Sequence, residues 1–299
     1  MRAGGRINWG RAALIGVPYV WLLVFFVFPF LIVLKISFSE IALAQPPYLP
    51  TWDTWDGVRA FFTAPNLENY QIIFTENLYR NAYLSSVRIA ATATAVTLLV
   101  GYPIAYAMAR APKGWQGALL MLVILPFWTS FLIRVYAWIG ILKRDGLLNL
   151  ALQSMGVIDQ PLAIHNTELA VYIGIVYSYL PFMVLPLYSA LEKQDLTLIE
   201  AASDLGARPW TAFFRITLPL SVPGIAAGCF LVFIPAMGEF VIPELLGGAQ
   251  TLMIGRTLWN EFFANRDWPL ASAVSVILLL VLVLPIMVFQ RMANRAGAG

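Results

Sequence analysis

Six long apolar stretches alternate with polar segments along the chain. Each is long enough to cross a bilayer, whose hydrocarbon core takes about 20 helical residues. The third stretch contains one charged residue, Arg134. In hydrocarbon every backbone N–H and C=O needs an internal partner, and no segment shows the ten-residue alternation of a membrane barrel, so the pattern predicts helices. The stretches are about Ala12–Leu34, Ile89–Ala109, Trp115–Leu142, Leu169–Leu191, Pro223–Leu246 and Trp268–Gln290.

The composition supports a membrane protein. Of the 299 residues, 60% are hydrophobic and 12% charged, about half the charged fraction of an ordinary soluble domain. Cys229 is the single cysteine, so an intrachain disulfide is excluded. The net charge of +3, without a dense basic stripe, argues against nucleic acid as a partner. We therefore expect an all-α integral membrane protein with lipid around it.

The placement of lysine and arginine predicts the topology, because cytoplasmic loops carry the excess of positive charge. We expect residues 1–11 and 291–299 to be cytoplasmic, 12–36 to form the first span, 37–81 a periplasmic loop, and 82–290 a core that includes a cytoplasmic loop at 192–222. The apolar part of the first span is too long for an ordinary signal peptide, which favours an uncleaved anchor over a cleaved signal.

The loop at 192–222 is the most informative polar segment. Leu196, Ile199, Ala202 and Leu205 follow helical spacing, which predicts an amphipathic helix. The sequence predicts that the helix ends at Gly206 and that a second one begins at Pro209, a residue that favours the first helical turn. Periodicity alone leaves open an ordinary interfacial helix between two spans.

The spacing of residues within this loop resembles a known motif. Glu200-Ala-Ala, Gly206 and Leu218-Pro219 fall in the register of the EAA motif of ABC importer permeases. Five further runs resemble polyamine permeases, most of all those that import putrescine and next those that prefer spermidine. These runs are 127–138, 179–186, 238–248, 253–256 and 267–273.

The resemblance implies a MetI-like permease fold of six transmembrane helices in the bacterial inner membrane. It also implies a heterodimer with a second homologous permease, two copies of an ABC ATPase, and a periplasmic polyamine-binding protein. The loop would supply the coupling helix that docks to the ATPase, through Glu200, Ala201, Ala202, Asp204, Leu205, Gly206, Ala207, Arg208 and Pro209.

The chain has no phosphate-binding loop of the form G-x-x-x-x-G-K-[ST]. We therefore expect ATP and magnesium to bind the partner ATPase, and this chain to be a non-catalytic subunit without a cofactor. His165, the only histidine, has no cluster of metal-ligating residues around it, and no metal site is predicted.

A path for a polyamine needs carboxylates or aromatic faces to receive its ammonium groups. Glu239 is the first candidate, because ionisable residues at membrane depth are costly, and Glu244 is a second. A structural ion pair is the alternative for Glu239, with Arg134 as the expected partner. The aromatic candidates are Trp128, Tyr136, Trp138, Tyr177 and Tyr179, each of which packing alone would also explain.

Two other classes of membrane protein compete with the importer. A secondary transporter needs no docking loop and usually shows paired repeats or several buried acids. A membrane enzyme needs a cluster of nucleophile, base or metal ligands, which the sequence lacks. Spermidine or another small cationic amine stays open as the substrate.

Overall fold

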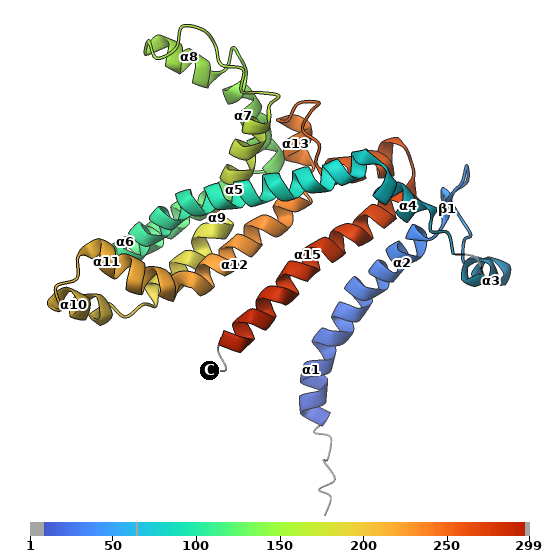
Figure 1. The fold of residues 1–299 in the computed structure, drawn as a ribbon, viewed down its shortest axis with the longest axis horizontal. Coiled ribbons are helices and arrows are strands. Elements are labelled where there is room, and N and C mark those ends of the chain that lie inside the picture. Colours follow the sequence, from blue (N-terminus) through green and yellow to red (C-terminus); the bar gives the residue numbers. More distant parts are fainter. Residues whose placement is uncertain (1–8, 64, 297–299) are drawn as a thin grey trace, which may run out of the picture. The chain divides into compact units, whose positions relative to one another are not determined.

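The computed structural model describes residues 9–63 and 65–296, and most of them are helical (Figure 1). Residues 1–8 and 297–299 of the predicted terminal segments lie outside this description. The chain divides into two compact units, one containing the described residues up to Asn77 and from Leu258 onward, the other Leu78–Thr257.

The first unit pairs the N-terminal helices with the C-terminal one. Helix α15 packs against α2 and α4, and a short antiparallel hairpin pairs Glu40 with Leu49. The elements are α1 (Trp9–Leu22), a π turn (Leu23–Val27), α2 (Phe28–Ser37), β1 (Glu40–Ile41), β2 (Tyr48–Leu49), α3 (Trp55–Thr63), α4 (Glu68–Thr75), a second π turn (Asn260–Ala264) and α15 (Trp268–Ala296).

Lys35, at the end of α2, is enclosed by the polypeptide that follows it. Its side chain is only 6% exposed, and its ammonium donates to the carbonyl of Pro50 at 2.5 Å. The same nitrogen lies 4.4 Å from the ring centroid of Tyr48 and 5.6 Å from that of Trp52. Cation–π contacts and a charged hydrogen bond both offset the desolvation of a buried ammonium. Lys35 therefore fastens the loop to α2.

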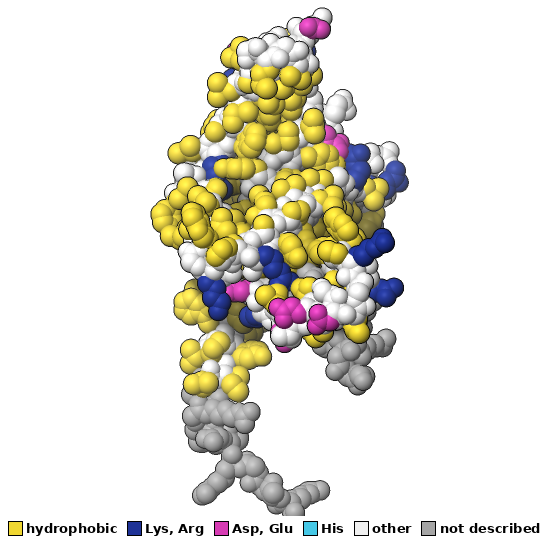
Figure 2. Space-filling model, turned by 90° about the vertical axis from the view of Figure 1, so that its left-hand side faces the viewer, with side chains coloured by type: hydrophobic (Ala, Val, Ile, Leu, Met, Phe, Trp, Pro, Cys, Tyr) yellow, Lys and Arg dark blue, Asp and Glu magenta, His cyan; other side chains and the backbone are white. Residues whose placement is uncertain are grey.

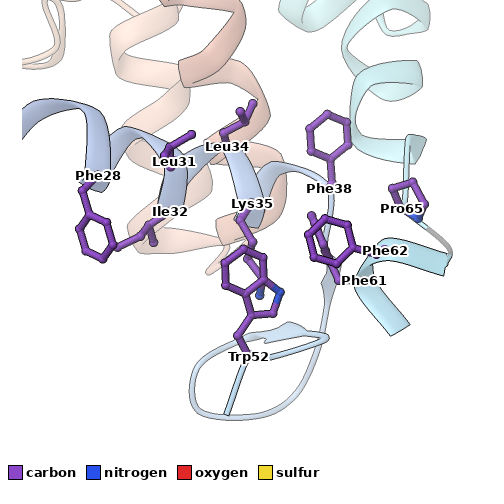
Figure 3. A pocket seen from close by; sticks show the side chains of 10 residues that line it. All are labelled: Phe28, Leu31, Ile32, Leu34, Lys35, Phe38, Trp52, Phe61, Phe62 and Pro65. Atoms are coloured by element: carbon purple, nitrogen blue, oxygen red, sulfur yellow. The ribbon is translucent and has the colours of Figure 1, made fainter. Parts of the chain in front are cut away.

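An apolar pocket of about 740 Å³ lies beside this lysine. Phe28, Ile32 and Leu34 of α2 form one wall, and Phe61 and Phe62 of α3 form another (Figure 3). In the loop, burial raises the pKa of the Tyr48 hydroxyl, and the nearby Asp53 carboxylate raises that pKa further. The surroundings of the ammonium are thus largely apolar, as cation–π stabilisation requires.

The second unit is built around α9 and α12. Its elements are α5 (Asn77–Arg110, shared with the first unit at Asn77), α6 (Lys113–Ile124), a 3₁₀ turn (Leu125–Trp128), α7 (Phe131–Leu142), α8 (Leu147–Ser154), α9 (Glu168–Glu192), α10 (Thr197–Asp204), α11 (Pro209–Ala212), a π turn (Phe213–Thr217), α12 (Leu218–Met237), α13 (Val241–Leu245) and α14 (Ile254–Trp259, whose last two residues belong to the first unit).

Glycines bring α9 and α12 into close contact. A Cβ atom added to Gly224 would lie 2.6 Å from the Cβ of Ala190, and one added to Gly228 would lie 2.7 Å from the sulfur of Met183. Small residues at such positions allow membrane helices to approach each other, since lipid offers no hydrophobic driving force for association. The packed core of this unit includes Met183 and Val232.

The structure confirms some of the predicted spans as apolar helices and differs from the prediction at others. Within the described residues, Leu14–Ser37, Asn77–Arg110, Glu168–Glu192 and Pro209–Met237 are helices long and apolar enough to cross a membrane. The sixth predicted span lies in α15, of which Trp268–Val283 forms a shorter apolar stretch. The exact number of six spans is therefore not established.

Two predicted spans are broken. The third predicted span, 115–142, is not one straight helix, because Lys113–Trp128 and Phe131–Ser154 meet at a 90° bend after a 3₁₀ turn. Pro126 in that turn has no N–H for a helical bond, and Thr129 and Ser130 are extended. The fifth predicted span, 223–246, ends instead at Met237, and a short helix follows from Val241.

Hydrophobic side chains make up much of the surface seen in Figure 2. Exposed large apolar residues occur along α1, α2, α6 and α7. Such surfaces are unfavourable in water and suit contact with hydrocarbon or with another membrane subunit.

The Lys35 contacts predict how tightly the loop is held. Replacing Lys35 with Met should loosen residues 38–63, because the hydrogen bond to Pro50 and the cation–π contacts are lost together. Trypsin should then cut more rapidly after Arg59, which is exposed on α3. Lys143→Met, at an exposed position in the other unit, is the control and should leave this cleavage rate unchanged. Equal rates in all three proteins would show that Lys35 does not fasten the loop.

Candidate functional site

A cavity of about 450 Å³ lies in the second unit, where two broken helical segments meet the middle of α9. The α6–α7 bend forms one side and the α12–α13 break another. Most of the lining is aromatic or aliphatic, with one carboxylate and one guanidinium. The lining residues are Phe127, Phe131, Arg134, Ser178, Tyr179, Phe182, Pro235, Gly238, Glu239, Phe240 and Val241.

Glu239 holds the α12–α13 break in place. Helix α12 ends at Met237, so Glu239 follows the span and does not lie within it, which corrects the predicted position. Its Oε1 accepts hydrogen bonds from the backbone N–H groups of Phe240, Val241 and Ile242 at 3.2, 3.0 and 3.4 Å. These are N–H groups that the start of a helix leaves without partners. The carboxylate therefore stabilises the first turn of α13.

The other oxygen of Glu239 faces a tyrosine. The Tyr179 hydroxyl, from the middle of α9, donates a hydrogen bond to Oε2. The Glu239 side chain is only 7% exposed, yet it lines the cavity. A charged group at this depth is tolerated because both of its oxygens are hydrogen-bonded. The site therefore offers a cation one fixed carboxylate with aromatic rings around it.

Arg134 lines the same cavity, but the predicted ion pair with Glu239 is absent. Arg88 pairs with Glu168 and Arg256 with Glu244, whereas Arg134 and Glu239 form no ion pair with each other. The Arg134 guanidinium carbon lies 5.2 Å from the ring centroid of Phe127 and 5.7 Å from that of Phe131. Glu239 has backbone donors and Tyr179 instead, which is why its charge needs no arginine in this conformation.

The other predicted path residues do not converge on the cavity. Trp138 packs edge-on against Tyr177 at 5.3 Å, and Tyr177 lines a separate cavity of about 260 Å³. Trp128 is 72% exposed and Tyr136 is 58% exposed. Glu244 pairs with Arg256 at 2.6 Å. Of the seven predicted candidates, only Glu239 and Tyr179 line this cavity.

Four cavity aromatics were missed by the sequence reasoning: Phe127, Phe131, Phe182 and Phe240. Phe127 and Phe182 also contact each other edge-on at 5.2 Å. Three of them stand next to Thr129-Ser130 or Glu239, where the apolar runs are interrupted by polar residues. That local interruption was the available signal for the break and for the rings gathered around it.

The predicted docking loop has the expected helix–turn–helix form. Helix α10 ends at Asp204, Gly206 has a positive φ of 79°, and α11 begins at Pro209. A left-handed residue at this position is the usual end of a helix, and glycine adopts it without steric cost. The sequence prediction of this turn is confirmed.

The loop presents most of its side chains to the surroundings. Leu205 is 89% exposed, and Glu200, Ala201, Asp204, Arg208 and Pro209 are also exposed. Ala202 and Ala207 are half-buried.

The described residues contain no group of three or more His, Cys, Asp or Glu side chains that would hold a metal ion. His165 lies in the segment between α8 and α9, with one ring nitrogen buried and without a hydrogen-bond partner.

Comparison with known proteins identifies the family. Residues 101–296 match the family model described as the inner membrane component of binding-protein-dependent transport systems, and this range contains both the cavity and the loop. The chain is 43% identical to the spermidine/putrescine transport system permease protein PotB of Haemophilus influenzae over 281 residues, covering 94% of this chain and 93% of that one. The Escherichia coli K12 PotB is likewise 43% identical, over 91% of this chain and 93% of its own.

More distant relatives share the fold. The chain is 30% identical to the Escherichia coli inner membrane ABC transporter permease protein YdcU, over 86% of this chain and 80% of that one. A solved bacterial ABC transporter for import of the acidic polysaccharide alginate has a TM-score of 0.66 at 18% identity, covering 96% of each chain. A second structure, of that kind of transporter with an alginate-bound periplasmic protein, has a TM-score of 0.67 at 17% identity, covering 97% of this chain and 95% of that one.

The resemblance to polyamine permeases is thus confirmed across nearly the whole chain, and the MetI-like permease fold with it. The chain belongs to the family of binding-protein-dependent transport system inner membrane components, the permease subunits of ABC importers.

Proposed function

We propose that this chain is the permease subunit of an ATP-driven importer of polyamines, with the Glu239 cavity as part of the substrate path. The observation that carries the proposal is a fixed carboxylate among aromatic side chains, in a chain 43% identical to permeases named for spermidine and putrescine. A carboxylate and ring faces are the groups that receive an alkylammonium ion in a low-dielectric site.

Putrescine is the substrate we propose first, with spermidine as the alternative. The cavity of about 450 Å³ is large enough for a four-carbon diamine and offers one carboxylate for one of its two ammonium groups. The second ammonium would face aromatic rings or the partner subunit. The relatives' shared name combines both polyamines, so it favours neither of the two.

The loop around Gly206 is proposed to dock to the ATPase, which would hold ATP and magnesium. The exposed α10–Gly206–α11 turn is the shape of a small knob that fits a cleft on a partner. Two ATPase copies, a second permease and a periplasmic polyamine-binding protein complete the proposed assembly. The positive-inside pattern supports cytoplasmic termini in the inner membrane. A secondary transporter would have no use for such a docking knob.

Gly206 provides a test of the docking turn. Gly206→Val should lower ATPase co-purification and uptake at least tenfold, because a β-branched residue is strained at φ of 79°. Gly206→Asn should retain both, since asparagine tolerates this conformation.

The matched control is Gly156→Val, because Gly156 has a similar φ of 70° and equally open space around it, but lies in the segment after α8. It should bind the ATPase normally. Normal ATPase binding by Gly206→Val, at normal membrane insertion, would contradict the docking assignment.

Glu239 provides a test of the path. Glu239→Gln keeps an oxygen for the N–H groups of α13 but removes the charge, so polyamine uptake should fall about tenfold or more at unchanged expression. Glu244→Gln, at the carboxylate paired with Arg256, is the control and should reduce uptake much less. Wild-type uptake kinetics for Glu239→Gln would leave Glu239 with a structural role only.

Competition uptake tests the substrate. Uptake of radiolabelled putrescine by the complete transporter in proteoliposomes should be ATP-dependent and inhibited by unlabelled putrescine at lower concentrations than by spermidine. Stronger inhibition by spermidine would reverse the proposed preference. The absence of inhibition by either amine, or uptake without ATP, would refute the proposed function.

A further inference from the structure

Arg134 is poorly satisfied in the conformation that the structure describes. Its Nε and Nη1 atoms are buried, and neither has a hydrogen-bond acceptor among the described residues. The guanidinium instead rests against the rings of Phe127 and Phe131. A guanidinium has five N–H donors, and burying some of them unpaired is unfavourable. Another position with an acceptor would therefore compete with this one.

The one carboxylate that lines the cavity, that of Glu239, is the acceptor we consider for Arg134. Glu239 Oε1 is committed to three backbone N–H groups, whereas Oε2 accepts from one side chain, the Tyr179 hydroxyl. Replacing one side-chain hydroxyl as the donor to Oε2 costs less than unfolding the first helical turn, which would be needed to free Oε1. Oε2 is therefore the carboxylate oxygen of Glu239 that a cation can approach.

Both charged residues stand beside a break in a helical segment. Arg134 is in the first turn of α7, which begins at Phe131 after the extended residues Thr129 and Ser130. Glu239 stands between the end of α12 and the start of α13. Changes of backbone torsion at such junctions move whole segments, so a modest shift brings the two charges closer or moves them apart.

We propose that Arg134 is a tethered competitor of the substrate's ammonium for Glu239. In a second conformation of the cavity the guanidinium pairs with Oε2, whereas in the conformation of the structure it rests on Phe127 and Phe131, which leaves the carboxylate to a cation. This inference rests on the proposed function, and it makes Arg134 a residue that sets how tightly the cavity binds substrate and how readily it releases it.

The charges of the cavity support this assignment. Its lining has one carboxylate and one guanidinium, so a dicationic amine meets a site of zero net charge. Even withdrawn, Arg134 repels the second ammonium of a diamine, because charges in a partly buried site are weakly screened. An importer gains from such a competitor, since a cavity that binds its substrate too tightly releases it slowly.

The test is equilibrium binding of radiolabelled putrescine to the assembled permease–ATPase complex in nanodiscs, without the binding protein. Arg134→Gln and Arg134→Met remove the competitor and should bind putrescine about tenfold more tightly than the wild type. The gain should disappear when Glu239→Gln is added, because the competition is for that carboxylate. Arg88→Met, which breaks an exposed ion pair outside the cavity, is the control and should bind as the wild type does.

Arg134→Lys keeps the positive charge and provides a second test of the proposal if the neutral variants fail to assemble. An ammonium has no planar face to stack on Phe127 and Phe131, so it should stay longer at Glu239 and weaken putrescine binding about threefold. A merely structural arginine would not give opposite shifts for Gln and Lys.

Unchanged or weaker binding by both neutral variants, or unchanged or tighter binding by Arg134→Lys, would overturn the proposal. If Glu239→Gln alone still weakens binding in that case, the proposed function stands without the competitor. If Glu239→Gln changes nothing in any background, the carboxylate is not a substrate site, and the role proposed for the cavity fails as well.

Discussion

The hydrogen bonds that the Glu239 carboxylate accepts from the backbone N–H groups at the start of α13 are the interaction on which the cavity depends. Within a membrane, a break in a helix exposes N–H groups that no water satisfies, and each costs several kcal/mol. Oε1 of Glu239 supplies an acceptor for three of them. Because Pro243 lacks an N–H, a continuous helix through this region would also leave the Glu239 carbonyl without its usual donor. The break, and the hollow beside it, are therefore stabilised by this side-chain oxygen.

The Glu239 carboxylate has features of both roles that the sequence leaves open for it, a structural role and a role in the substrate path. One oxygen caps α13, and the other accepts a hydrogen bond from Tyr179, which also lines the cavity. A purely structural glutamate would be expected to bury both oxygens in permanent bonds, whereas a purely substrate-binding one would have no reason to cap a helix. Placing the charge on a cap also fixes its position, since the backbone of α13 determines where Oε1 lies.

The sequence predicted those features that depend on local pattern. Gly206 and Pro209 define the loop turn through backbone preferences that hold in any context, and the apolar runs locate the spans because hydrocarbon demands them. The breaks at Thr129-Ser130 and Gly238-Glu239 were missed because only one or two polar residues interrupt long apolar runs, and a span-length window averages over them. The Arg134–Glu239 pair was wrong because backbone N–H groups, invisible in a list of side chains, already satisfied the glutamate. The enclosure of Lys35 was likewise unpredictable, since Tyr48, Trp52 and Pro50 come from a loop without periodicity.

One helical element joins the proposed docking loop to the cavity. Pro209–Met237 runs without a bend large enough to divide it, from the turn after Gly206 to the residue before Gly238 (Figure 1). Over 29 residues such a helix spans about 40 Å. The glycine-lined contact with α9 carries Tyr179 on the opposing helix, so a displacement of α12 along or about its axis alters the Tyr179–Glu239 contact directly. Movement of the loop by a partner would therefore need no chain of intermediate residues to reach the carboxylate, because one continuous helical element has the loop at one end and the Glu239 break at the other.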